Sequence, residues 1–90
     1  MLHLRYTTAF KKDYKRLQKR GYAMAKLRQV LEKLANGEMN EEQIKDHPLR
    51  GIYAGARDCH IEPDWVLIYS IAGDELCLLR TGSHADLFKK

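Results

Sequence analysis

Three histidines and one aspartate, His47, His60, Asp64 and His84, are the side chains of this chain best suited to acid–base chemistry. Histidine exchanges protons near neutral pH because its unperturbed pKa is about 6.5. Three imidazoles and a carboxylate can supply a general base, a general acid and a group that orients one of them. Cleavage of RNA through its 2′-hydroxyl needs this set: a base removes the hydroxyl proton, the oxygen attacks the adjacent phosphorus, and an acid protonates the leaving 5′-oxygen.

Other side chains could assist such a reaction without a metal ion. A cation must meet the negative charge that grows on phosphorus. Arg50, Arg57 and Arg80 are candidates because a guanidinium group is a planar, two-pronged donor to phosphate. Trp65 or Phe88 could stack on an unpaired base.

Hairpin pairing predicts that these scattered residues meet at one end of a sheet. A turn at residues 55–56 would pair a strand at 49–55 with the next strand and bring His47 close to Asp64. The following turn would place His60 opposite Val66, just inside the same end. Since neighbouring strands lie about 4.8 Å apart, their side chains would be neighbours.

A third turn, centred on Gly73, would extend the cluster. It places Trp65 opposite Thr81 and carries the chain toward His84, beside Asp64. The predicted site therefore depends on three turns between strands, which bring residues distant in the sequence together.

Each residue also has a simpler interpretation. Asp64 follows Pro63 and suits a turn, Ser83 is a good helix cap, and Trp65 and Phe88 would usually pack in a core. Three histidines could also hold zinc, but the candidate ligands lie on separate turns, and His60 and Asp64 are the only closely spaced pair among them.

The first half of the chain predicts a strand followed by two helices. Residues 2–6 alternate in polarity and are typical of a strand. Thr7 or Thr8 can cap a helix that Gly21 ends, and a second apolar stripe of helical spacing stops at 36–37. A short helical turn is expected over 41–45.

The second half predicts a meander of strands at 49–55, 57–61, 65–71 and 75–81. The strand at 65–71 is apolar on both faces, which suits a central strand covered by the helices. Ser83 and Asp86 form a capping box that opens a last short helix. The fold class is α+β: an N-terminal strand, a helical hairpin packed on a mainly antiparallel four-to-five-stranded sheet, and a short C-terminal helix.

Composition narrows the class of protein. Ninety residues make one domain, 1–90, and contents of 44% hydrophobic and 31% charged residues exclude a disordered chain. No apolar run approaches the roughly 20 residues of a membrane helix, and no signal peptide is expected. Cys59 and Cys77 fit no disulfide framework or metal spacing, so we expect two buried thiols in a reducing cytoplasm.

Positive charge is concentrated in the N-terminal half. Residues 1–45 hold eleven Lys/Arg against five Asp/Glu, whereas the whole chain carries a net charge of +4. A cationic helix suits a polyanion such as RNA or an acidic protein, although a solvated helix face would look the same. The candidate RNA-binding residues of this helix are Lys11, Lys12, Lys15, Arg16 and Lys19.

Three segments carry a resemblance that covers the whole chain. KDHPLRG at 45–51, RDCHIEPDWVLIY at 57–69 and RTGSHADLF at 80–88 resemble the YafQ branch of the RelE/ParE toxin superfamily. The resemblance implies a RelE-like fold and a type II toxin that is a ribosome-dependent mRNA endoribonuclease. It also implies a mechanism without metal or other cofactor, which leaves a 2′,3′-cyclic phosphate or its 3′-phosphate product.

The resemblance also implies site residues and partners. Family active-site roles fall on His47, His60, Asp64, His84 and Phe88. We take His84 as the general acid; His47, His60 and Asp64 remain alternatives for the base and the orienting group, and Phe88 would position mRNA. The implied partners are a DinJ-like antitoxin, the ribosome with its mRNA, and operator DNA only through the antitoxin complex, with no membrane.

Other functions remain open at this point. A ParE-like toxin that poisons DNA gyrase has the same fold but needs no histidine cluster. A non-enzymatic RNA- or protein-binding module would use only the basic helix, and a zinc protein would use the histidines as ligands.

Overall fold

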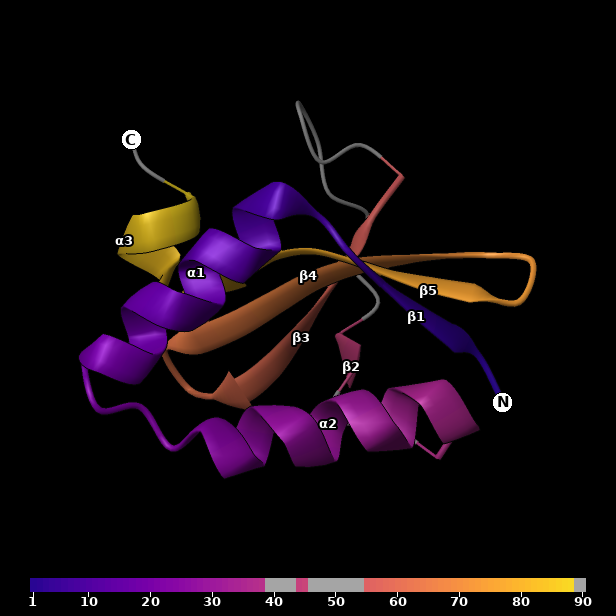
Figure 1. Cartoon of the computed structure of the whole chain (residues 1–90), viewed down its shortest axis with the longest axis horizontal. Helices are drawn as coiled ribbons and strands as arrows, with labels where there is room; N and C mark the ends of the chain where they lie inside the picture. Colours follow the sequence, from indigo (N-terminus) through magenta and orange to yellow (C-terminus); the bar gives the residue numbers. More distant parts are fainter. Residues whose placement is uncertain (39–43, 46–54, 89–90) are drawn as a thin grey trace.

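The computed structural model describes residues 1–38, 44–45 and 55–88 (Figure 1). Within these described ranges, three helices and five strands follow one another. In order they are β1 (His3–Tyr6), α1 (Thr8–Lys19), α2 (Met24–Asn36), β2 (Ile44–Lys45), β3 (Arg57–Glu62), β4 (Trp65–Ala72), β5 (Glu75–Gly82) and α3 (His84–Leu87).

The strands form one five-stranded sheet in the order β1-β5-β4-β3-β2. Three of the four pairings are antiparallel, and β1 pairs with β5 in parallel. The parallel pairing follows from the helical crossover that separates the first strand from the rest. The α+β class, the mainly antiparallel sheet and the central place of β4 are confirmed.

Local signals fix the ends of the two long helices as predicted. The Thr7 hydroxyl oxygen accepts a hydrogen bond from the Phe10 backbone N–H at 3.0 Å and caps α1. Gly21 after α1 and Gly37 after α2 have φ values of 84° and 72°, a left-handed conformation that glycine adopts without a steric penalty.

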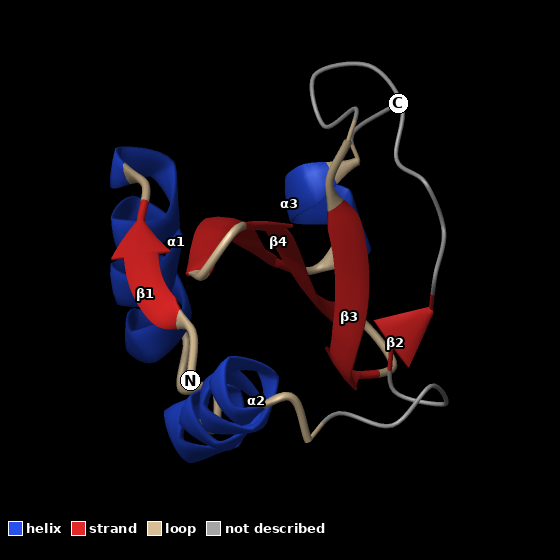
Figure 2. Ribbon diagram, turned by 90° about the vertical axis from the view of Figure 1, so that its right-hand side faces the viewer, coloured by secondary structure: helices blue, strands red, loops and turns tan. Residues whose placement is uncertain are grey.

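The sheet separates two apolar clusters. On one face, α1 and α2 pack on alternate residues of the central strands, including the buried Trp65, Leu67 and Tyr69 of β4. On the other face, Val66 and Ile68 of the same strand pack with α3. Figure 2 shows α1 with β1 on one side of the molecule, and α3 beside the far end of β4. The continuous apolar run of β4 is therefore explained by burial on both faces.

One predicted register is confirmed and one is wrong. His60 pairs with Val66 across β3 and β4, as expected. Across β4 and β5, however, Thr81 pairs with Leu67 and not with Trp65. The connecting turn has two residues, and a register shift between Ile68 and Tyr69 then moves the pairing further.

The prediction of a short helical turn over 41–45 is wrong for its last two residues. Residues Ile44–Lys45, expected in a short helical turn, form β2 and pair with Cys59 and Asp58 of β3. At these two positions the partner strand is thus β2, and not the strand predicted over 49–55. Pairing with an open sheet edge outweighs a weak local helix signal. The predicted strand itself lies outside the described residues, apart from Gly55 in a turn.

The cysteines differ in their surroundings. Cys59 is fully buried among the residues under the helices, and this burial, together with nearby Asp58, raises the pKa of its thiol to about 11. Cys77 is only half-buried, so the prediction of two buried thiols is wrong for Cys77. None of the described helices is long and apolar enough to cross a bilayer.

Candidate active site

A capping box fixes α3, the element that carries His84. The Ser83 hydroxyl oxygen accepts from the Asp86 backbone N–H at 3.1 Å, and the Ser83 N–H donates to an Asp86 carboxylate oxygen at 3.0 Å. Both bonds were predicted from the spacing of the two residues. Gly82 precedes the box, and a Cβ there would lie 3.0 Å from Asp86. The absence of a side chain at Gly82 leaves room for Asp86, and the capping box places His84 at the start of the helix.

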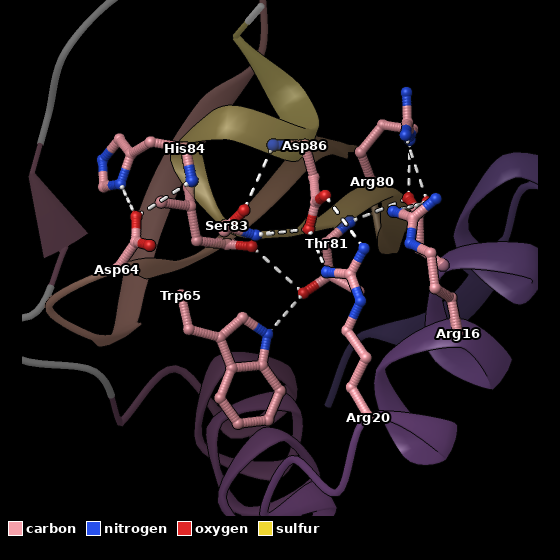
Figure 3. A network of polar contacts seen from close by, with 11 residues as sticks. Arg16, Arg20, Asp64, Trp65, Arg80, Thr81, Ser83, His84 and Asp86 are labelled. Atoms are coloured by element: carbon pink, nitrogen blue, oxygen red, sulfur yellow. Dashed lines mark hydrogen bonds and ion pairs between the residues drawn. The ribbon is translucent and has the colours of Figure 1, made fainter.

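His84 and Asp64 form the central contact of the site (Figure 3). His84 Nδ1 lies 2.7 Å from Asp64 Oδ1, and the His84 backbone N–H donates to the same oxygen at 3.1 Å. These bonds lower the pKa of the Asp64 carboxyl below its ordinary value, the side-chain bond contributing most. Since an ionised carboxylate can only accept, the contact places a proton on Nδ1 and directs Nε2 away from Asp64.

His60 and Phe88 complete the described part of the cluster. The ring centroids of His60 and His84 are 5.5 Å apart, and those of His84 and Phe88 are 6.1 Å apart. His60, Asp64, His84 and Phe88 therefore meet as predicted, although they lie on β3, on the β3–β4 turn and at the two ends of α3. His47 lies outside the described residues.

The site is open to solvent. The side chain of Asp64 is 73% exposed and that of His84 is 49% exposed. The imidazole of His84 can thus be reached from solvent without a change in the core.

An ion pair that sequence reasoning missed ties α3 to α1. Arg20 donates to both carboxylate oxygens of Asp86, at 2.8 and 3.3 Å. The Arg20 guanidinium lowers the pKa of the Asp86 carboxyl to about 2, and Asp86 in turn raises the pKa of Arg20. The two residues are 66 positions apart, so no spacing rule could connect them.

A second unpredicted network surrounds Asp13, whose side chain is 2% exposed. Asp13 accepts from Arg16 at 2.8 Å, from the Arg80 Nε and Nη2 atoms, and from the Thr81 backbone N–H at 3.2 Å. A lone acid within the basic, apolar-striped run at 10–17 was the signal that could have found it. Arg16 and Arg80, predicted to bind RNA, are thus held by a buried carboxylate, and the three charged groups together carry one net positive charge.

Trp65 does not have the role considered for it in base stacking. Its side chain is 1% exposed, it packs against Tyr22 with ring centroids 5.0 Å apart, and its indole N–H donates to the Thr81 hydroxyl at 2.9 Å. Trp65 is a core residue. Phe88, in contrast, is half-buried at the rim of the cluster.

The remaining predicted RNA contacts are spread over the surface. Arg57, exposed, begins β3 three residues before His60, and Arg50 lies outside the described residues. Within the described ranges, no three His, Cys, Asp or Glu side chains are grouped to hold a metal ion. Four exposed lysines lie along α1: Lys11, Lys12, Lys15 and Lys19.

Comparison with known proteins identifies the family. Residues 2–89 match the family described as the bacterial toxin of type II toxin-antitoxin system, YafQ. The chain belongs to the YafQ toxin family. Among the curated relatives of this YafQ-family toxin is the mRNA interferase toxin YafQ of Escherichia coli K12, which is 43% identical over 86 residues and 94% of each chain.

Solved structures of bacterial toxins share the fold. The toxin in the E. coli DinJ–YafQ complex has 41% identity and a TM-score of 0.85, with 98% of this chain and 99% of that chain covered. A copper-bound mutant toxin from Helicobacter pylori has 41% identity and a TM-score of 0.85, with 98% and 100% covered. The predicted family and the RelE-like α+β fold are thereby confirmed.

Proposed function

We propose that this YafQ-type mRNA interferase cleaves RNA at the cluster of His60, Asp64 and His84, by acid–base chemistry that needs no metal ion. The 2′-oxygen loses its proton to a base and bonds to the adjacent phosphorus, while the bond from phosphorus to the 5′-oxygen breaks. The acid protonates that oxygen. The products are a 2′,3′-cyclic phosphate, which water can open to a 3′-phosphate, and a 5′-hydroxyl.

The observation that carries this proposal is the 2.7 Å contact between His84 and Asp64. The ionised carboxylate fixes the ring orientation through Nδ1 and stabilises the imidazolium form. Nε2–H of that imidazolium is then the proton for the leaving 5′-oxygen. His84 acts as general acid, and Asp64 is the group that orients it.

His60 is our choice for the general base. Asp64 is engaged twice by His84, which leaves His60 as the described side chain beside the acid that can take a proton. The ring centroids of His60 and His84 are 5.5 Å apart, so a phosphate bound beside the two rings would lie within reach of both. His47 is the alternative base.

Charge and stacking complete the proposed mechanism. The group formed by Asp13, Arg16 and Arg80 keeps a net positive charge, and the Arg80 side chain is 26% exposed, so it can stabilise the developing phosphate charge. Phe88 supports a base of the mRNA by stacking. The exposed lysines of α1, together with Arg57 and Arg50, contact RNA phosphates, which predicts binding that weakens steeply with salt.

The proposed setting is the cytoplasmic ribosome, where the toxin cuts mRNA in the A site. The E. coli relative crystallises in a complex with DinJ, which supports a DinJ-like antitoxin as partner of this chain. Operator DNA is contacted only through the antitoxin complex.

The test is a translation reaction programmed with a defined mRNA, to which the purified toxin is added. We expect cuts within the translated frame whose upstream fragments end in a 2′,3′-cyclic phosphate or 3′-phosphate, and no cuts when ribosomes are omitted. Ends with a 3′-hydroxyl and 5′-phosphate would contradict the mechanism. Intact mRNA together with trapped gyrase–DNA breaks would instead identify a ParE-like toxin.

Variants separate the base candidates and the binding-module alternative. His60→Gln and His47→Gln are compared in the same reaction, and the larger loss of cleavage identifies the base. If the triple variant with His47, His60 and His84 all changed to Gln keeps its full growth-inhibiting effect, the protein is a non-enzymatic binding module.

A further inference from the structure

A hollow beside the histidine cluster has no part in the proposed cleavage step. It holds about 380 Å³, within the range of about 300–1,000 Å³ that small-molecule sites occupy. It lies between the connection from α1 to α2 and the turn from β3 to β4, which are neighbours in Figure 1. The described residues that line it are Gly21, Tyr22, Ala23, Glu62, Asp64 and Trp65.

Asp64 joins this hollow to the proposed active site. Its oxygen Oδ1 accepts from His84 Nδ1 at 2.7 Å and from the His84 backbone N–H at 3.1 Å. The same side chain lines the hollow. An RNA strand whose phosphate lies beside His84 therefore brings the base of a flanking nucleotide close to the hollow.

An aromatic ring forms one wall. Tyr22 is half-buried, and its ring meets that of Trp65 edge to face, with the centroids 5.0 Å apart and the planes at 82°. This contact orients the Tyr22 ring, whose exposed part lines the hollow. Gly21 and Ala23, on either side, are small and leave room for a planar group. A base can therefore stack on Tyr22, as unpaired bases do on aromatic side chains.

The polar wall is acidic. Among the described residues that line the hollow, Glu62 and Asp64 are acids and none is Lys or Arg. Lys26 donates to Oε1 of Glu62 at 2.8 Å, and no other group of the described residues donates to this side chain, which is 41% exposed. Oxygen Oε2 of Glu62 is therefore available as an acceptor. The wall repels a phosphate group and favours a group that donates hydrogen bonds.

Exocyclic amino groups of nucleobases are donors of this kind. Cytosine presents its N4 amino group and adenine its N6 amino group, and carboxylates accept from cytosine N4 in protein–DNA contacts. Uracil instead carries a carbonyl oxygen on each side of its single N–H, and a carboxylate repels these oxygens. The acidic wall thus favours one class of base and opposes the other, and both effects add to specificity.

We propose that the hollow is a base-specificity subsite. Tyr22 stacks on a nucleobase that flanks the scissile phosphate, and Glu62 accepts from the exocyclic amino group of that base. The inference rests on the proposed function, and it makes cytosine or adenine preferred over uracil at this position. Glu62 does not touch the reacting atoms, so it decides which sites are cut and not how they are cut.

Binding is tested by NMR titration of the full chain with cytidine and uridine 5′-monophosphate. These pyrimidines are of equal size, and at position 4 one has an amino group and the other a carbonyl oxygen. We expect the cytidine nucleotide to bind at least fivefold more tightly and to shift the backbone amide signals of Gly21, Tyr22 and Glu62. Ribose 5-phosphate measures binding through the phosphate alone.

Variants assign the preference to its residues. Glu62→Gln should reduce the difference between the two nucleotides to less than twofold. Glu75→Gln is the matched control, because Glu75 is 43% exposed and also forms an ion pair, with Arg5 at 3.2 Å. Tyr22→Leu should weaken both nucleotides at least threefold, and Tyr22→Phe should restore them. Circular dichroism confirms that each variant is folded.

Cleavage is tested with pairs of mRNAs that differ only in C or U next to a mapped cut, on its 5′ side in one pair and on its 3′ side in the other. In the translation reaction we expect one pair to be cut at least fivefold faster with C. Glu62→Gln should bring the rates within twofold of each other, whereas Glu75→Gln should leave their ratio unchanged.

Several results would overturn the subsite. They are equal Kd values for the two nucleotides, equal binding of ribose 5-phosphate, unmoved amide signals of Gly21 and Tyr22, and a preference that survives Glu62→Gln. A chain that prefers the cytidine nucleotide but cuts no mRNA would remove the proposed function and leave the subsite intact. A chain that cuts both members of each mRNA pair at equal rates would keep the proposed function and remove the subsite.

Discussion

Two carboxylates, Asp13 and Asp64, hold basic side chains in this molecule, and they differ chiefly in burial. The side chain of Asp13 is 2% exposed and is bonded by two arginines and a backbone N–H. The side chain of Asp64 is 73% exposed and is bonded by His84 alone among the described residues. A carboxylate in contact with a basic side chain can therefore support either the fold or the proposed reaction.

Burial decides which purpose is served. A buried charge that loses its partners is costly, so the contacts of Asp13 join α1 to β5 and support the fold. An exposed pair adds little to stability, so the contact of Asp64 with His84 is free to serve reaction. The comparison predicts large stability effects at Asp13 and large activity effects at Asp64.

The largest expected effect is that of Asp13→Ala. Removal of the carboxylate leaves the Arg80 guanidinium and the Thr81 N–H without this partner in a buried setting, which typically costs about 3–5 kcal/mol. Chemical denaturation measures the free energy of unfolding of the variant. Since small domains are stable by only about 5–15 kcal/mol, we expect partial or complete unfolding. A variant as stable as the wild-type protein would contradict the structural role of Asp13.

Asp64→Asn tests the other side of the comparison. The amide keeps the size of the side chain but no longer stabilises an imidazolium, so we expect cleavage to fall by about 10- to 100-fold. The free energy of unfolding should change by less than about 0.5 kcal/mol, as for other exposed positions. A loss of stability equal to that of Asp13→Ala would show that the two carboxylates do not differ in role.

A smaller effect is expected at Arg20, which binds Asp86 of α3. Arg20→Ala removes the tether of α3, so we expect kcat to fall several-fold with little change in KM, because His84 is displaced rather than removed. Arg20→Lys should restore part of the activity. Lys26→Ala is the matched control, since it breaks the exposed ion pair with Glu62 at 2.8 Å. Equal effects of Arg20→Ala and Lys26→Ala would reject the positioning role.

The last effect, seen only at acid pH, is the pH dependence of stability that Asp86 causes. Its pKa is about 2 in the folded chain, against about 3.9 in an unfolded one. Its contribution to stability is therefore fully present above pH 4 and is lost as the pH falls toward 2. Denaturation of the wild-type protein and Asp86→Asn across this range should show a flatter decline for the variant. Parallel curves would contradict the shifted pKa.

Local chemistry made much of the fold predictable. The caps of α1 and α3, the glycines after the two long helices and the pairing of His60 with Val66 depend on residues close in the sequence. The meeting of His60, Asp64 and His84 followed from these turns. This prediction held although the β4–β5 register was wrong, because a shift of one or two residues moves a side chain only a short way along a strand.

What could not be predicted depends on contacts between distant segments. Strand β2 forms because β3 offers an open edge, although its own residues favoured a helical turn. Arg80, which binds Asp13, and Arg20, which binds Asp86, are each more than sixty residues from their partner. Burial of Trp65 likewise depends on packing against Tyr22, which sequence spacing does not reveal.

The most direct test of the account is cleavage by His84→Gln in the ribosome-programmed reaction. Glutamine keeps a polar side chain at the start of α3 but cannot deliver a proton to the leaving oxygen. We expect the rate of mRNA cleavage to fall at least 100-fold, in the range usual for loss of a general acid. The circular dichroism spectrum and the free energy of unfolding should stay those of the wild-type protein. A folded His84→Gln variant that cuts mRNA at the wild-type rate would contradict the account.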